Sequence, residues 1–346
     1  MKPSIRRTGG VCPRHHDDSL FNLFGDSRAR SRRGALLVLP LFVAMEMLAP
    51  APSKARAAPK SLTPLYKRIA KDLKAGKPLV VTLHVALCDN RVIACGNRRL
   101  GNGDAPSGNL YWGGGSGVRA WFDAMKSYTR VYLDRGDGKR VLERVVYHHR
   151  VKSPSVLWRK MGVTKPFDVL VVGLAYRGLS ISRAMGSFLQ DVSTSQAQTL
   201  KIKKTGRVRW KVRFRGGSHV VGYLGHNHLM DVKKSRYKWP RFTRKQHIGY
   251  FALACRSAPY LAPRLTRPKT HALTLTHVLM YPGAFTAYGL IRGVARGASV
   301  KKVFLRGVRW YARKQNRPVR KVRWYFTHGG RLRFHRRYAQ RSSTKK

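Results

Sequence analysis

The run "KPLVVTLHVALCDN", residues 77–90, decides the fold class. A continuous apolar run that ends in turn residues is typical of a strand buried on both faces, as in a parallel sheet. Comparable runs occupy residues 167–176, 219–225, 248–255 and 271–280, and helical patterns lie at 61–76, 118–128, 178–193 and 283–297. Because apolar strands alternate with helices, we expect an α/β domain with a mostly parallel sheet flanked by helices.

Two segments have the alternating pattern of added β-hairpins. Residues 139–152 are β-branched and indicate a strand outside the central core, and residues 199–216 form a hairpin around Thr205-Gly206. The second strand of that hairpin carries one basic face, formed by Arg207, Arg209, Lys211, Arg213 and Arg215. We therefore expect an α/β domain at 58–298 with hairpin insertions near 140–152 and 199–215, followed by a basic, aromatic extension at 299–346.

The charge balance is extreme. The chain has 71 Lys and Arg against 14 Asp and Glu, a formal net charge of +57, and no acidic residue follows Asp231. Such a charge favours anionic surroundings, and an acidic envelope polymer is a better candidate than nucleic acid for an exported protein. The missing acids also exclude a catalytic carboxylate from the C-terminal third of the chain.

Residues 28–57 have the three-part layout of a secretory signal. A basic segment precedes an apolar run at 35–49, and Ala55-Arg56-Ala57 is a small-residue cleavage pattern. The pair Arg32-Arg33 in a long leader resembles a bacterial twin-arginine signal. We expect cleavage near Ala57 and export to the periplasm or the extracellular space; the alternative is an anchor that stays attached. No second segment is long enough to span a membrane.

The cysteines fit an exported chain. Cys12 lies in the leader, while Cys88 and Cys95 flank a short loop and are able to pair in an oxidising compartment. Cys255 is left over, either as a reactive thiol or as a small buried side chain.

His226 and Cys255 each end an apolar strand. If these strands are parallel neighbours, they lie about 4.8 Å apart, which brings the two side chains near each other at the carboxyl edge of the sheet. An imidazole beside a thiol is the minimum for a cysteine nucleophile, and backbone N–H groups nearby are candidates for an oxyanion hole.

Here the sequence resembles the caspase-like peptidases, the group that includes the clostripain, gingipain and legumain types. The resemblance rests on "YLGHN" and "LACRS" and on the order of elements over residues 77–297. It implies that His226 is the general base and Cys255 the nucleophile. Two positions depart from the family's pattern: the Gly that usually follows His is Asn227, and the Asp that often precedes Ala-Cys is Leu253.

The same resemblance suggests three further residues. Asn227 would supply the backbone donor of the oxyanion hole, and Asn109 and Tyr111 belong to a Gly-rich loop that would help form the substrate pocket. The leading hypothesis is an exported caspase-like cysteine peptidase that acts on peptide or protein substrates and needs no cofactor.

Two alternatives stay open. One is a catalytically inactive binding protein of the same fold, held to an anionic envelope polymer or to nucleic acid by the basic hairpin and the C-terminal extension. The other is a metal-dependent hydrolase that uses His226 and His228, because "HNHLMD" partly follows a two-histidine, one-aspartate metal motif.

Overall fold

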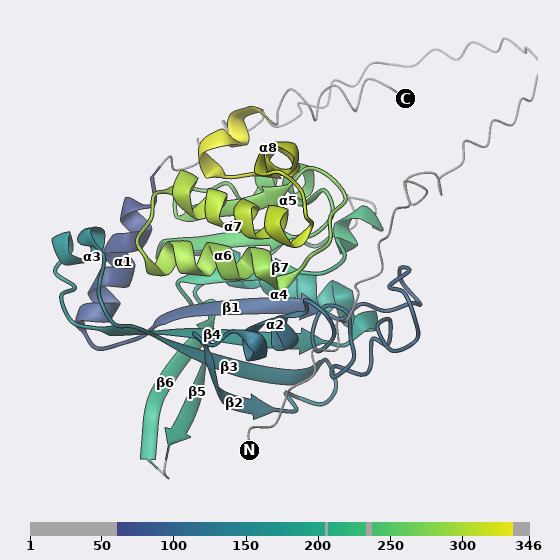
Figure 1. The fold of residues 1–346 in the computed structure, drawn as a ribbon, viewed down its shortest axis with the longest axis horizontal. Coiled ribbons are helices and arrows are strands. Elements are labelled where there is room, and N and C mark those ends of the chain that lie inside the picture. Colours follow the sequence, from purple (N-terminus) through teal and green to yellow (C-terminus); the bar gives the residue numbers. More distant parts are fainter. Residues whose placement is uncertain (1–60, 205–206, 233–236, 335–346) are drawn as a thin grey trace, which may run out of the picture. The chain divides into compact units, whose positions relative to one another are not determined.

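In the computed structural model, residues 61–204, 207–232 and 237–334 are described, and they belong to one unit (Figure 1). The main sheet has eight strands in the order β10-β9-β8-β7-β1-β4-β3-β2, and β5 and β6 form a separate antiparallel pair. The strands are β1 Leu79–Ala86, β2 Thr129–Asp134, β3 Val141–Val151, β4 Phe167–Tyr176, β5 Ala197–Lys204, β6 Arg207–Arg215, β7 Val220–Leu224, β8 Ile248–Leu253, β9 Thr270–Thr276 and β10 Phe326–Thr327.

The five central strands, β4, β1, β7, β8 and β9, run parallel, and β2, β3 and β10 add antiparallel edges. The fold is therefore α/β with a mixed, mostly parallel sheet, as the apolar runs predicted. Every residue of β1 is buried, which explains why its sequence is continuously apolar instead of alternating.

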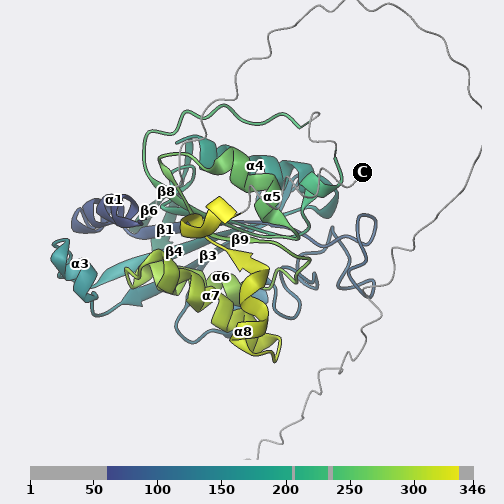
Figure 2. The ribbon, with the colours of Figure 1, turned by 90° about the horizontal axis from the view of Figure 1, so that it is seen from above.

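Helices cover both faces of the sheet. They are α1 Thr63–Lys74, α2 Val118–Ala124, α3 Val156–Lys160, α4 Ile181–Ser193, α5 Ser257–Leu265, α6 Ala284–Ala295, α7 Val300–Lys314 and α8 Val319–Val322. Figure 2 shows α4 and α5 on one side of the sheet and α6 and α7 on the other. In β1, Leu79, Val81, Leu83 and Val85 belong to the core beneath α6 and α7, while Val80 and Ala86 belong to the core beneath α4 and α5.

The segment expected outside the central core joins the main sheet instead. β3 pairs along its length with β4, and its residues Val145, Val146 and Tyr147 are buried. Its hairpin partner β2 is largely exposed and was not expected from the sequence. Residues near 140–152 are therefore an edge of the sheet, whereas the second expected hairpin, β5-β6, does form a sheet of its own.

The expected C-terminal extension begins as part of the domain. Residues 300–314 form α7, whose Val303, Phe304 and Val308 are buried in the core shared with α6. Farther on, β10 pairs with β9. Apolar residues recur at helical spacing in this segment, but frequent Arg and Lys residues mask the pattern. Residues 300–327 are therefore integral to the fold.

Several expectations concern residues outside the described part: the signal at 28–57, Cys12, the turn at 205–206 and the end of the basic extension after 334. Within the described ranges, none of the helices is both long and apolar enough to cross a bilayer.

Candidate functional site at the carboxyl edge of the sheet

The two predicted half-sites lie at the ends of neighbouring parallel strands. β7 pairs with β8 in a register that places Leu224 beside Leu253, and His226 and Cys255 each follow two residues later. Gly225 lies between the end of β7 and His226. It has a φ of 142°, and a Cβ there would lie 3.0 Å from the carbonyl oxygen of Ala86 in β1. A glycine is needed because the chain turns against β1 at this point.

Asn227 connects the half-sites directly. Its side-chain Nδ2 donates a hydrogen bond to the carbonyl oxygen of Cys255 at 2.8 Å, and its Oδ1 accepts one from the N–H of Leu229 at 3.2 Å. The residue has no exposed surface. Asn227 thus acts as a brace between the loops after β7 and β8. The oxyanion role expected of its backbone N–H stays a prediction.

His226 is held by an aspartate from the same loop. A short 3-10 turn, His228–Met230, brings Asp231 back so that its carboxylate oxygens lie 2.8 and 2.9 Å from His226 Nε2. The backbone of His226 is also fixed, because the hydroxyl of Tyr223 donates to its carbonyl oxygen at 2.7 Å. The imidazole therefore has a carboxylate on one nitrogen, and Nδ1 is the nitrogen left to exchange a proton.

Cys255 lies in a turn between β8 and α5. Its Sγ is 3.7 Å from the carbonyl oxygen of Met280 and 3.5 Å from the N–H of the same residue, and the side chain is partly exposed. Within the described ranges, the thiol makes no hydrogen bond to His226. Burial raises the pKa of the thiol, although the contact with Met280 opposes this. The pKa shift therefore favours the thiol over the thiolate in the absence of substrate.

The residue after the thiol has an uncommon backbone. Arg256 adopts a φ of 48°, in the left-handed region that non-glycine residues rarely occupy, and α5 begins directly after it. Its N–H donates to the carbonyl oxygen of Val278. This sharp turn separates Cys255 from the strand and from the helix, so the thiol is presented at the sheet edge between them.

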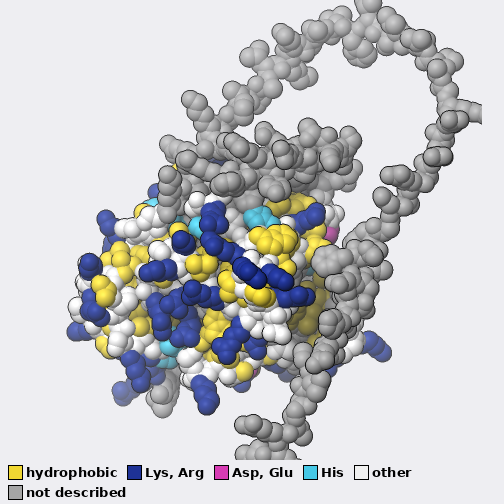
Figure 3. All heavy atoms as spheres, turned by 45° about the horizontal axis from the view of Figure 1, so that its top comes forward, with side chains coloured by type: hydrophobic (Ala, Val, Ile, Leu, Met, Phe, Trp, Pro, Cys, Tyr) yellow, Lys and Arg dark blue, Asp and Glu magenta, His cyan; other side chains and the backbone are white. Residues whose placement is uncertain are grey.

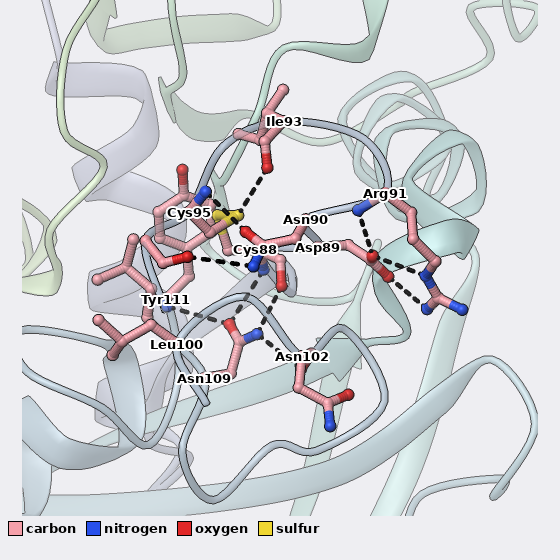
Figure 4. Close-up of a disulfide and its surroundings, with 12 residues drawn as sticks. Cys88, Asp89, Asn90, Arg91, Ile93, Cys95, Leu100, Asn102, Asn109 and Tyr111 are labelled. Atoms are coloured by element: carbon pink, nitrogen blue, oxygen red, sulfur yellow. Dashed lines mark hydrogen bonds and ion pairs between the residues drawn. A yellow bond between two sulfur atoms is a disulfide. The ribbon is translucent and has the colours of Figure 1, made fainter. Parts of the chain in front are cut away.

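Figure 4 shows part of the Gly-rich loop after β1, including Asn109 and Tyr111. Tyr111 is close enough that Cys255 contributes, after burial, to raising its pKa. Asn109 is fully buried: it accepts from the N–H of Cys88 at 3.0 Å and donates to the carbonyl oxygen of Cys88 at 2.7 Å. Tyr111 thus lies within electrostatic range of the candidate nucleophile, whereas Asn109 holds the loop together.

The same loop is closed by a disulfide between Cys88 and Cys95, whose Cα atoms are 5.9 Å apart. The sequence left this pairing open. Asn90 adds a second tie, because its Oδ1 accepts from the N–H of Cys95 at 2.9 Å. The rigid loop fixes the position of Tyr111 relative to the ends of β1 and β8.

The second histidine of the loop does not complete a metal site here. His228 Nδ1 lies 3.7 Å from Asp231, so His226 and His228 share one carboxylate. Across residues 61–204, 207–232 and 237–334, no group of three or more His, Cys, Asp or Glu side chains is arranged to hold a metal ion.

The basic hairpin is exposed on the expected face with one exception. Arg207, Arg209, Lys211 and Arg213 are exposed, while Trp210, Val212 and Phe214 on the other face are buried. Arg215 departs from the expectation: its Nε donates to the buried carboxylate of Asp191 at 3.2 Å, so it serves an internal ion pair. The exposed basic face therefore ends at Arg213.

The acidic side chains of the described residues all interact with other groups of the chain. Each of the ten carboxylates in the described ranges pairs with a histidine or a basic side chain or accepts backbone or side-chain hydrogen bonds. Figure 3 shows Lys and Arg spread over one face with almost no Asp or Glu between them. The surplus positive charge has no internal counterpart.

No protein-family model, curated protein or solved structure matches this chain. The arrangement of its own residues therefore carries the functional argument. Sequence reasoning missed two contacts, Asp231 on His226 and the Asn227 side chain on Cys255. The aspartate could have been suspected, because Asn227 is a residue type that favours turns and would fold a short loop back.

Proposed function

We propose that this chain is an exported cysteine-type hydrolase of caspase-like character, with Cys255 as nucleophile and His226 as general base, acting on the peptide bonds of a peptide or protein substrate. One observation carries the proposal: a partly exposed thiol and an aspartate-held imidazole end adjacent parallel strands and are braced together by Asn227. A nucleophile, a base and a third group that orients the base are the parts that acyl transfer requires.

The raised pKa of the thiol favours one form of this mechanism. Because the pKa shift favours the thiol form of Cys255, His226 would remove the proton while the sulfur attacks the substrate carbonyl. The C–N bond then breaks, the amine leaves with the proton from the imidazolium, and water releases the acyl group from sulfur. Catalytic hydrogen bonds are often long before substrate binds, so the sulfur and the imidazole would close on each other in the complex.

A peptide-library assay on the full chain tests the proposal. The wild type is expected to cleave a subset of peptides, and Cys255→Ala and His226→Ala are expected to lose that cleavage. Gln315→Ala, a change at an exposed position with an ordinary negative φ, serves as the control and should keep it. Activity that survives Cys255→Ala but disappears with a chelator would favour the metal alternative, and cleavage by no form would exclude a peptidase.

A second candidate, attachment to a polyanion, is favoured by the register of the β5-β6 hairpin. Lys201 is directly opposite Lys211, and Arg209 and Arg213 extend the same exposed face. Like charges opposite each other on a sheet are destabilising unless an anion lies between them. The hairpin would therefore bind an anionic polymer outside the cell.

Elution from immobilised heparin separates this candidate from a general charge effect. Lys201→Gln/Arg209→Gln/Lys211→Gln is expected to elute at lower salt than the wild type, because fewer counterions are released on binding. A variant with the same net charge, Lys67→Gln/Lys71→Gln/Lys74→Gln on the exposed side of α1, is the matched control. Equal shifts for both variants would contradict a specific role for the hairpin.

A further inference from the structure

A cleft of about 680 Å³ lies at the other edge of the sheet, between residues 149–157 and residues 292–306. It lies at the end of β3, where Val151 pairs with Phe167, the first residue of β4. The cleft is therefore at the amino edge of the parallel strands, opposite the edge that carries Cys255. Six basic side chains line it: Arg150, Lys152, Arg292, Arg296, Lys302 and Arg306.

The positive charge in this cleft is largely uncompensated. No acidic side chain is among its lining residues. Arg150 donates to Asp168 at 2.9 Å, and Arg292 donates to the hydroxyl of Tyr288 at 3.1 Å. Arg296, Lys302 and Arg306 form no ion pair with any carboxylate of the described part of the chain. Concave surfaces lined by charge of one sign concentrate the field and attract counterions.

The basic groups are close enough to disfavour one another's charge. Burial is the largest cause that lowers the pKa of Arg306, and Arg296 and Arg292 lower it further. Arg292 and Arg296 act in the same direction on His149, whose pKa is also lowered mainly by burial. Two arginines thus exert repulsion on both walls of the cleft, and an anion between them would relieve it.

A second cleft, of about 520 Å³, shows that a basic lining alone does not leave a cleft with unpaired positive charge. Four arginines line it, but so does Asp137, and two of the four are neutralised: Arg144 pairs with Asp134, and Arg215 pairs with Asp191. Its charges are largely balanced from within the chain. The basic side chains of the 680 Å³ cleft, in contrast, are largely without acidic partners and are available to bind an anionic ligand.

We infer that the 680 Å³ cleft is a binding site for an anion that carries two or more phosphate groups or phosphoesters. The guanidinium fork of arginine matches phosphate oxygens in pairs, and several unpaired cations call for a ligand with several negative charges. The volume falls within the range of about 300–1,000 Å³ that is common for small-molecule sites. The phosphate could belong to a free solute or to a lipid headgroup.

Calorimetric titration of the full chain with inorganic pyrophosphate at low salt tests the free-solute source. Arg296→Gln/Arg306→Gln is expected to bind at least about tenfold more weakly than the wild type, because two charge-assisted bonds are lost. Arg317→Gln/Arg320→Gln removes the same charge from exposed positions outside the cleft and should bind like the wild type. Thermal unfolding should show that the cleft variant is at least as stable, since repulsion has been removed.

Sedimentation with vesicles of cardiolipin, whose headgroup carries two phosphodiesters, against phosphatidylcholine vesicles, tests the headgroup source. If pyrophosphate does not bind but vesicle binding is lost only in the cleft variant, the site stands and its phosphate belongs to lipid. If the cleft and control variants behave alike in both experiments, or if neither probe binds, the inference is wrong.

Discussion

Two of the histidine–aspartate pairs in the described part of the chain lie in very different surroundings. In the first, His84 of β1 has no exposed surface; its Nε2 is 2.8 Å from Asp191 and its Nδ1 is 3.0 Å from the hydroxyl of Tyr176. In the second, the side chains of His226 and Asp231 are 14% and 41% exposed, and among the described residues only Nε2 of the histidine has a hydrogen-bond partner. In the first pair both ring nitrogens of the histidine are therefore hydrogen-bonded, whereas in the second pair Nδ1 is available among the described residues.

This difference in burial and hydrogen bonding indicates which of the two pairs is able to transfer a proton. Burial lowers the pKa of His84 even though Asp191 opposes the effect, so its ring is neutral and both nitrogens are committed to the core. His226 lies at a sheet edge, near a thiol, with a proton-accepting position available. A buried pair specifies structure, whereas a half-satisfied pair at an edge is a candidate for function.

Replacing the buried histidine should have the largest effect. His84→Ala leaves Asp191, whose side chain is 2% exposed, with Arg215 as its remaining charged partner. Removal of the neutral ring leaves the Asp191 carboxylate and the Tyr176 hydroxyl each short of a buried hydrogen bond, which lowers the free energy of unfolding by about 1–3 kcal/mol for each group. His226→Ala, the matched change at the exposed pair, should cost less than about 1 kcal/mol. Urea unfolding measures both, and equal losses would remove the contrast between the pairs.

Acid should destabilise the fold through its buried histidines. Burial lowers the pKa of His271 to about 4, from an ordinary value near 6.5. Between these values the unfolded chain binds more protons than the folded one, so stability is fully present above pH 6.5 and is lost as the pH falls toward 4. This histidine alone contributes about 3 kcal/mol over that range.

His271→Asn should accordingly flatten the dependence of the unfolding free energy on pH between 6.5 and 4, measured by urea unfolding at several pH values. His84 should act in the same direction, since its pKa is also lowered. An unchanged slope in His271→Asn would show that the ring is solvated or already charged in the folded protein.

Asp231→Asn tests the exposed pair as a positioning device. If Asp231 orients His226, kcat of the proposed hydrolysis should fall on the order of tenfold to a hundredfold with KM unchanged. That is less than the ~10⁴ found where a triad aspartate is buried, because Asp231 is partly exposed. Asp231→Glu should recover part of the rate. Asp72→Asn, at another partly exposed carboxylate that contacts a histidine, is the control; a change in KM alone would contradict positioning.

Much of the fold was predictable, and the reason is visible in particular residues. β1, β7 and β8 are buried on both faces, so their apolar runs identify them and place His226 and Cys255 at one edge. The contacts that refine the site were not predictable, because they depend on how a loop turns. Asp231 reaches His226 only through the turn at 228–230, and no periodicity encodes that. α7 was missed because its polar side is almost entirely basic.

The smallest expected effect separates two forms of the proposed chemistry. In a preformed thiolate–imidazolium pair, His226→Ala would slow the alkylation of Cys255 by iodoacetamide at pH 7 by more than about tenfold, because the thiolate would be lost. Here the thiol contacts Met280, and burial raises its pKa. We therefore expect alkylation without substrate to change by less than about twofold in His226→Ala and to rise steeply above pH 8 in both forms. Mass spectrometry of the labelled peptide measures the rates. A large loss of labelling in His226→Ala would mean that the base and the nucleophile are already joined at rest, and that the proton moves before substrate arrives.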